Sequence, residues 1–322
     1  MRIRSLPLAV AMVGSLGCAS GQPHEAKATA AQTGPVALFY SDVELAPGRR
    51  FPSPLARGSV AGRPTVFVID TGAQVSVVST TVAREAGLES VAAEDAQDPS
   101  GNKVETRRTE NPRIALDGLG ALPDRPTAVV TLPPILERLG IGGIVSPQAL
   151  ADRDRTVILD LPHGELRVVP ANASQPSTRG GALAMPEANL CRYEQSGFSA
   201  RALTLPAKVE GIDVTLEVDT GASGSFVVAE GAPGRLLGAR TDAAQGKAVS
   251  AGTTATTETR RLEGVRVQFG SVDTKGPVLV VPGARDEHCG YEGRLGIDRL
   301  RACVLVIEEL RIHGRCDAPS GS

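Results

Sequence analysis

The sequence contains the tetrapeptide Asp-Thr-Gly-Ala twice, at residues 70–73 and again at residues 219–222. Each copy follows a run rich in apolar and β-branched residues, TVFVI before the first and VTLEV before the second. Alternation within such runs predicts a β-strand, and the glycine that follows allows the backbone to turn sharply and to approach another segment closely. Two identical turns in matching surroundings predict two halves of one chain that build one structure jointly.

The similarity between the two halves extends well beyond the tetrapeptide. VAGRPTVFVIDTGA (60–73) aligns without a gap with VEGIDVTLEVDTGA (209–222), and each contains a glycine where a strand must turn back. Further along, and in the same order, IGGIVSPQAL (141–150) aligns with YEGRLGIDRL (291–300). Matching blocks in one order are the signature of an internal duplication.

The repeat and the composition of the intervening segments predict the domain organisation. A chain of 322 residues is long enough for two domains, and with 3% aromatic residues and no Trp their cores must consist of aliphatic side chains. A stretch rich in Pro, Ser and Gly separates the halves. We expect a signal peptide at 1–17, a flexible tether at 18–37, a first lobe at 38–170, an inter-lobe linker at 171–199, a second lobe at 200–316 and a tail at 317–322.

The N-terminus has the features of an export signal. Arg2 and Arg4 precede a short apolar stretch from Leu6 to Leu16 that cannot span a bilayer. The stretch ends in Ser-Leu-Gly-Cys, which is similar to the lipobox of bacterial lipoproteins. This similarity implies a lipid on Cys18 and a membrane-anchored protein of the bacterial cell envelope. An ordinary secretory signal that is cleaved nearby is the alternative.

The remaining cysteines and the charge limit the other possibilities. Four cysteines besides Cys18 predict two disulfides in an exported protein, and all three pairings of Cys191, Cys289, Cys303 and Cys316 remain open. A net charge of −2 does not suggest nucleic acid as a partner. No C-x-x-C motif is present, so we expect neither a metal site nor a cofactor.

The paired Asp-Thr-Gly-Ala turns, each after an apolar strand and each followed by an apolar-Gly segment, resemble the retropepsin and pepsin clan of aspartic proteases. The resemblance covers residues 55–170 and 200–314. It implies an all-β fold in which two pseudo-symmetric retropepsin-like β-barrel lobes with short helices are fused in one chain. Because both half-sites are then in the same chain, a monomer should suffice.

The resemblance implies that Asp70 and Asp219 form a catalytic dyad. Two carboxylates about 3 Å apart repel by about 5 kcal/mol at an effective dielectric of about 20, so such a pair shares one proton. The ionised member would take a proton from a water, and the protonated member would donate to the carbonyl of an extended polypeptide substrate. The turn residues that would support the dyad are Thr71, Gly72, Ala73, Thr220, Gly221 and Ala222.

A hairpin flap follows each such turn in this clan, and two polar segments are candidates for it. They are SGNKVETRR (100–108) and AGTTATTETRR (251–261), with Gly101 and Gly252 near their tips. A mobile hairpin of this kind would exclude water and hold the substrate. Plain surface hairpins are the alternative.

One position departs from the pattern of the clan. Ser146 stands where a glycine is usual, whereas the second half keeps Gly296. A serine would be strained if the backbone there required a glycine conformation. The leading hypothesis is therefore an exported aspartic endopeptidase, and the alternative is a catalytically inactive peptide-binding lipoprotein with the same fold. An unrelated β-rich structural lipoprotein is the third possibility.

Overall fold

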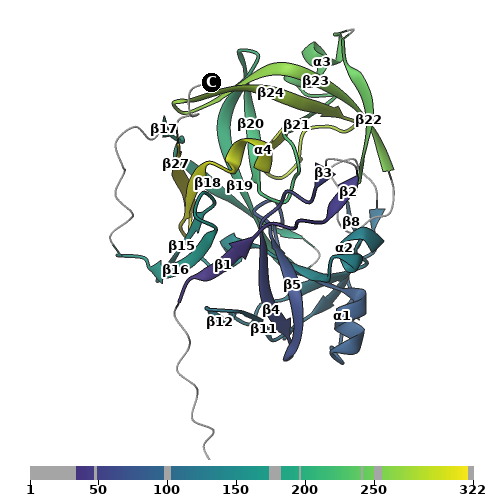
Figure 1. The fold of residues 1–322 in the computed structure, drawn as a ribbon, viewed down its shortest axis with the longest axis vertical. Helices are drawn as coiled ribbons and strands as arrows, with labels where there is room; N and C mark the ends of the chain where they lie inside the picture. Colours follow the sequence, from purple (N-terminus) through teal and green to yellow (C-terminus); the bar gives the residue numbers. More distant parts are fainter. Residues whose placement is uncertain are drawn as a thin grey trace, which may run out of the picture. The chain divides into compact units, whose positions relative to one another are not determined.

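The computed structural model describes residues 34–46, 49–97, 103–173, 183–195, 197–240, 242–249 and 256–317. Within these ranges the chain is mostly β-strand with few and short helices, as predicted (Figure 1). Cys18 and the expected signal peptide, together with Gly101 and Gly252, lie outside the described residues.

The elements of the two halves follow one another in a similar order. The first half contains β1 (Val36–Phe39), β2 (Glu44–Ala46), β3 (Arg49–Arg50), β4 (Leu55–Val60), β5 (Arg63–Ile69), β6 (Val77–Ser79), α1 (Thr80–Glu85), β7 (Val91–Ala92), β8 (Ala96–Gln97), β9 (Lys103–Val104), β10 (Arg107–Thr109), β11 (Ile114–Leu116), β12 (Gly120–Ala121), β13 (Thr127–Val130), α2 (Pro134–Arg138), β14 (Ile141–Val145), the 3-10 helix η1 (Pro147–Ala149), β15 (Arg155–Asp160) and β16 (Glu165–Pro170). The second half contains β17 (Leu183–Ala184), β18 (Ala188–Gln195), β19 (Phe198–Val209), β20 (Ile212–Asp219), β21 (Phe226–Val228), α3 (Ala232–Gly238), β22 (Ala244–Val249), β23 (Thr256–Phe269), β24 (Val272–Val281), β25 (Gly293–Gly296), α4 (Ile297–Leu300), β26 (Cys303–Ile307) and β27 (Arg311–Cys316).

The strands of each lobe pair in the same way. In the first lobe β4 and β5 form a hairpin, β14 runs parallel to β5, β6 runs antiparallel to β14, and β13 runs parallel to β6. In the second lobe β19, β20, β25, β21 and β24 repeat this arrangement pair by pair. The duplication in the sequence is therefore a duplication of strand topology, with β5 and β20, the strands that precede the two Asp-Thr-Gly-Ala turns, in equivalent places.

The turn of each first hairpin has the backbone conformation that the repeated glycine predicts. Ala61 and Gly62 have φ of 48° and 83°, and Glu210 and Gly211 have φ of 50° and 82°. Positive φ at both central residues is the geometry whose twist matches the right-handed twist of the flanking strands. Both hairpins thus lead into the Asp-Thr-Gly-Ala turn with the same register.

The strand before each turn is more deeply buried than simple alternation indicates. Phe67, Val68 and Ile69 at the end of β5 are all buried. Phe67 and Ile69 belong to one apolar cluster and Val68 to another, so both faces of the strand are covered. Successive side chains of this strand therefore alternate between two apolar clusters. They do not alternate between the core and the solvent.

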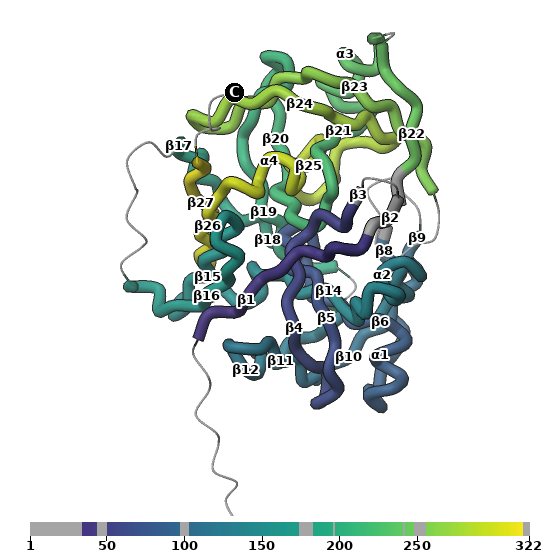
Figure 2. Tube along the Cα trace, in the orientation of Figure 1, coloured from purple at the N-terminus to yellow at the C-terminus, as the bar shows by residue number. Residues whose placement is uncertain are grey.

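Pairings between strands of the two halves join them, and the segment expected as a linker takes part (Figure 2). The hairpin β15–β16 pairs with the hairpin β26–β27 through β15 and β26, and β1 adds to β16. Strands β17 and β18 extend the sheet beside β27, although they lie within the range 171–199 that we expected to act as a linker. The segment between the halves therefore contains strands whose backbone groups pair along the edge of β27.

Two disulfides are present, as the cysteine count predicts. Cys191 on β18 pairs with Cys289 in the loop before β25, and Cys303 pairs with Cys316 across β26 and β27. Among the residues that the structure describes, no helix is long and apolar enough to cross a membrane. Two disulfides are compatible with an exported protein.

Candidate active site

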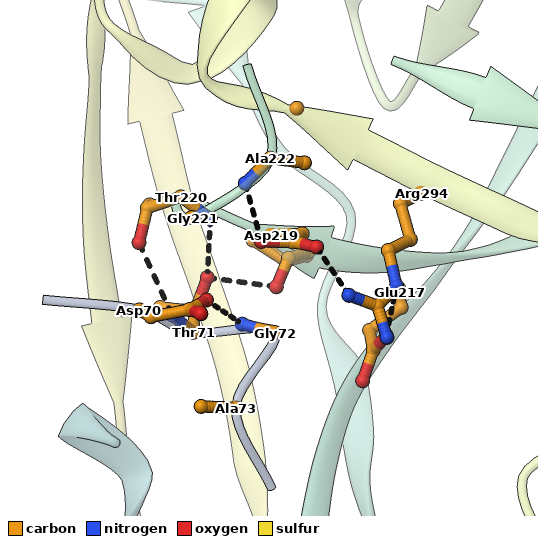
Figure 3. A network of polar contacts seen from close by, with 12 residues as sticks. Asp70, Thr71, Gly72, Ala73, Glu217, Asp219, Thr220, Gly221, Ala222 and Arg294 are labelled. Carbon is orange, nitrogen blue, oxygen red and sulfur yellow. Dashed lines mark hydrogen bonds and ion pairs between the residues drawn. The ribbon is translucent and has the colours of Figure 1, made fainter. Parts of the chain in front are cut away.

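Strands β5 and β20 end side by side and bring the two Asp-Thr-Gly-Ala turns together (Figure 3). The position of each aspartate is set by the strand that runs parallel to its own. The amide of Asp70 donates to the carbonyl of Val145 at 3.0 Å, and Asp219 lies opposite Gly296 in the register of β20 and β25. The two apolar-Gly segments recognised in the sequence therefore support the turns from behind.

The two threonines form a reciprocal lock between the lobes. Thr71 Oγ1 donates to the carbonyl of Val218 at 2.7 Å and accepts from the amide of Thr220 at 3.0 Å. Thr220 Oγ1 donates to the carbonyl of Ile69 at 2.7 Å and accepts from the amide of Thr71 at 3.1 Å. Both threonines are fully buried, so these four bonds satisfy backbone groups that water does not reach.

The two glycines are required by close approach across the site. A Cβ at Gly72 would lie 2.3 Å from Cγ of Asp219, and a Cβ at Gly221 would lie 2.3 Å from Cγ of Asp70. Neither glycine has φ in the left-handed region. Each lobe thus uses its glycine to make room for the carboxyl group of the other lobe.

The two carboxyl groups lie close together where the turns meet, each against the glycine of the opposite turn. Asp70 Oδ1 accepts from the amide of Gly72 at 2.8 Å, and Asp219 Oδ1 accepts from the amide of Ala222 at 2.7 Å. Burial and the negative charge of Asp219 raise the pKa of Asp70 well above its ordinary value, although Arg294 opposes the shift. The neighbouring negative charge and the burial thus both favour the protonated form of Asp70.

A buried ion pair that the sequence analysis missed lies directly beside Asp219. Arg294 Nη1 is 2.6 Å from Asp219 Oδ2, and Arg294 Nε is 2.8 Å from Glu217 Oε2, the latter without hydrogen-bond geometry (Figure 3). The repeat alignment contained the signal, because Glu217 and Arg294 occupy positions that are Val68 and Ile144 in the first half. Two positions that are apolar in the first half carry opposite charges in the second, and this difference could have indicated an ion pair.

The charges of this cluster depend strongly on burial. Burial raises the pKa of Glu217 to about 7, with Arg294 opposing the shift and Asp219 adding to it. Burial acts against the charged form of Arg294, but Glu217 and Asp219 together raise the pKa of its guanidinium well above the ordinary value. Arg294 therefore remains a cation, while Glu217 changes its charge near neutral pH.

We expect Glu217→Gln to reduce the pH dependence of stability. The folded protein binds the proton of Glu217 more tightly than the unfolded chain, so this stabilisation is complete below the ordinary pKa of 4.5 and is lost as the pH rises to about 7. The loss corresponds to about 3 kcal/mol. Urea unfolding between pH 4.5 and 7.5 should show a decline that is smaller by about this amount in the variant. Equal declines in wild type and variant would contradict it, and Glu263→Gln, an exposed change, is the control.

Outer hydroxyl and amide groups hold the segments behind the dyad. Ser76 Oγ accepts from the amide of Ser146 at 3.2 Å, and Ser225 Oγ accepts from the amide of Gly296 at 3.0 Å, so the two halves repeat this contact. Ser146 has φ of −82° and ψ of 108°, which any residue can adopt. The serine in place of glycine therefore causes no backbone strain. The side-chain amide of Gln148 adds bonds to the carbonyls of Thr71 and Ala73, at 3.0 and 2.8 Å, in the first lobe.

The two flap candidates begin as hairpins, but their tips lie outside the described residues. Strands β8 and β9 pair on either side of residues 98–102, and β22 and β23 pair on either side of residues 250–255. Gly101 and Gly252 fall within these gaps, so their role remains a prediction. Within the described part of the chain, no group of three His, Cys, Asp or Glu side chains is placed to hold a metal ion.

Comparison with known families agrees with the fold and with the two turns. A family model described as aspartyl protease matches the chain twice, over residues 56–144 and 205–298. The two matches correspond to the two lobes, and together they cover more than half of the sequence. The chain therefore belongs to the aspartyl protease family, as a retropepsin-like member with two lobes. No curated protein matches the chain.

Proposed function

We propose that this protein is an exported aspartic endopeptidase whose catalytic groups are Asp70 and Asp219. The observation that carries the proposal is the meeting of the two carboxyl groups after β5 and β20, between two turns that Thr71 and Thr220 lock together. One proton on two carboxyl groups supplies a general base and a general acid at the same place. The family match supports a hydrolase of this type.

The chemistry requires only a water molecule and the dyad. The ionised carboxylate takes a proton from the water as its oxygen attacks the carbonyl carbon of the scissile peptide bond. The protonated carboxyl group donates its proton to the carbonyl oxygen, which gives a neutral diol. Transfer of a proton to the amide nitrogen then allows the C–N bond to break. The locked turns keep both carboxyl groups in position throughout, which preserves the orientation that this step needs.

The remaining parts of the proposal concern the substrate and the place of action. We propose that the substrate is a polypeptide in extended conformation, held under the hairpins β8–β9 and β22–β23. We further propose that the protein acts as a monomer at the bacterial cell envelope, anchored through a lipid on Cys18. The two disulfides support export, and the presence of both half-sites in one chain supports a monomer.

Asparagine in place of either catalytic aspartate is expected to abolish peptide cleavage. Asp219→Asn and Asp70→Asn each remove the group that binds or releases the shared proton, so kcat/KM should fall by at least about 1,000-fold. The purified protein would be incubated with a diverse peptide mixture from pH 3 to pH 8, and the products identified by mass spectrometry. Asp213→Asn is the matched control, because Asp213 is an exposed residue of the same strand as Asp219.

The outcome distinguishes the enzyme from the peptide-binding alternative. Cleavage by wild type and by Asp213→Asn, with none by the dyad variants, would establish an aspartic endopeptidase. Folded wild-type protein that cleaves no peptide at any pH would contradict the proposal and favour a binding protein. Ser146 does not favour that alternative, because its backbone is in an ordinary extended conformation.

A further inference from the structure

The two aspartates of the dyad have unequal surroundings. In the first lobe the neighbouring strand positions hold Val68 and Ile144, which lie opposite each other in the register of β5 and β14. In the second lobe the equivalent positions hold Glu217 and Arg294, opposite each other in the register of β20 and β25. Residues two apart on a strand share a face, so each of these pairs lies on the same face as the aspartate of its own lobe. The pseudo-symmetry of the site is thus broken by charge.

Of the two aspartates, Arg294 bonds Asp219 and not Asp70. Its Nη1 donates to Asp219 Oδ2 at 2.6 Å, and the other oxygen of that carboxylate accepts from the amide of Ala222. Asp70 Oδ1 instead accepts a hydrogen bond from the amide of Gly72. A guanidinium bound to a carboxylate oxygen favours the ionised form of that group. The contact therefore distinguishes the two members of the dyad without any substrate.

The guanidinium is held in place from several sides. Glu217 lies 2.8 Å from its Nε, and the ring of Phe226 lies 5.9 Å from its Cζ. The side chain of Gln74 donates to Glu217 at 3.4 Å and to the hydroxyl of Tyr291 at 3.3 Å.

Two further groups complete the surroundings of this cluster. Tyr193 donates to the side chain of Gln74, and the charge of Asp286 also acts on Glu217. With only 16% of its side chain exposed, Arg294 has little freedom to leave Asp219.

We propose that Arg294, oriented by Glu217, fixes the roles within the dyad, so that Asp219 is the carboxylate that accepts the proton of the water and Asp70 is the acid that protonates the carbonyl oxygen. Arg294 is a positioning residue, because it acts through Asp219. The catalytic roles rest on the proposed function, but the unequal charge exists in the protein without substrate.

The assignment closes the proton cycle. As the water oxygen bonds to the carbonyl carbon, one water proton moves to Asp219 and the proton of Asp70 moves to the carbonyl oxygen. When the C–N bond breaks, Asp219 returns its proton to the leaving nitrogen, and Asp70 takes a proton from a hydroxyl of the diol. Asp219 is then ionised beside Arg294 again, and Asp70 is protonated, as at the start.

The charge of each carboxyl group can be measured without turnover. Aspartate labelled with ¹³C in the side-chain carboxyl would be incorporated into the protein, and the two dyad signals would be assigned from their loss in Asp70→Asn and Asp219→Asn. From acidic to neutral pH, we expect the Asp219 signal at the position of a carboxylate and the Asp70 signal at that of a protonated acid. The shared proton should prefer Asp70 by at least about tenfold.

The variants transfer the surroundings of the first lobe to the second. Glu217→Val together with Arg294→Ile reproduces the apolar pair that the same strand register already accommodates in the first lobe. Replacement of a buried ion pair by apolar residues is often tolerated, whereas removal of one partner is costly. In this double variant we expect the shared proton's preference for Asp70 to fall to within about threefold of equality. The single variant Arg294→Lys should keep part of the preference, because it keeps the positive charge.

Arg299→Met is the matched control, since Arg299 is a buried arginine of the same segment that pairs with Asp298 and does not contact the dyad. It should leave both carboxyl signals unchanged.

Three results would overturn the inference. They are equal signals from the two carboxyl groups in wild type, an ionised Asp70 beside a protonated Asp219, and an unchanged preference in the folded double variant. A protein that cleaves no peptide but shows the unequal signals would refute the proposed function and uphold the unequal dyad. A protein that cleaves peptides with equal signals would refute the inference alone.

Discussion

Thr71→Val is expected to lower the free energy of unfolding by about 2–5 kcal/mol, because the change removes a hydroxyl group and leaves two buried backbone groups unpaired. The carbonyl of Val218 loses its donor and the amide of Thr220 loses its acceptor, while the volume of the side chain hardly changes. Thr220→Val should have a similar effect through the carbonyl of Ile69. Unfolding in urea, followed by circular dichroism because the chain has no Trp, measures the loss.

Two controls separate the lock from a general effect of valine. Thr71→Ser keeps the hydroxyl group and should retain most of the stability. Thr65→Val, on the strand that precedes this turn, removes only one long bond of 3.4 Å and should change the free energy of unfolding by less than about 1 kcal/mol. The double variant of Thr71 and Thr220 should lose less than the sum of the single losses, because each side chain bonds the backbone of the other's turn and the two changes are therefore coupled. If Thr71→Val were as stable as wild type, the hydrogen bonds between the two turns would make no contribution to the free energy of unfolding.

Gly72→Ala is expected to lower kcat/KM by at least about 100-fold, because the new methyl group displaces the opposite carboxyl group. The added Cβ would lie 2.3 Å from Cγ of Asp219 and 2.6 Å from each of its oxygens. The carboxyl group would have to move by about 1 Å, and a displacement of that size at reacting atoms costs about two orders of magnitude in rate. Gly221→Ala should act in the same way on Asp70. Both values follow from steady-state cleavage of one peptide identified in the mixture.

Gly224→Ala serves as the control for this change. Gly224 lies in the loop that follows the second turn, and a Cβ there would meet no atom within 4 Å. This variant should keep its activity within about threefold of wild type, since no group has to move. If Gly72→Ala also stayed within about tenfold, the close approach of the two turns would not be needed for catalysis.

The asymmetry of the site has a physical cost that the first lobe avoids. A buried ion pair requires the desolvation of both charges, and the apolar pair Val68 and Ile144 shows that the same strands fold without it. Retention of Glu217 and Arg294 in one lobe only therefore has no evident benefit for stability. A role in the charge of the dyad gives a reason for the pair.

Several features could be predicted from the sequence because their causes are local or repeated. The turns at Ala61–Gly62 and at Glu210–Gly211 require positive φ, and a glycine in each copy indicated it. Asp70 and Asp219 were identified by the tetrapeptide, and the duplication implied that the two copies lie in equivalent places. Each of these signals depends on residues close in the chain or on a comparison of the chain with itself.

Other features depended on contacts between residues far apart in the chain. The pairing of the four cysteines followed from which strands lie side by side, and the sequence left three possibilities open. Strand β18 was taken for part of a linker because its composition does not show that β27 has a free edge for it.

The sequence by itself therefore determined the class of fold, the two lobes and the equivalent places of the two aspartates. Strand periodicity and turn chemistry depend on residues that are neighbours in the chain. Only the tertiary structure decided that the glycines make room for the opposite carboxyl groups and that Arg294 reaches Asp219. The first relation arises where the two lobes meet, and the second where β20 and β25 pair within the second lobe. Distances there are fixed by the packing of whole sheets, and local sequence does not encode them.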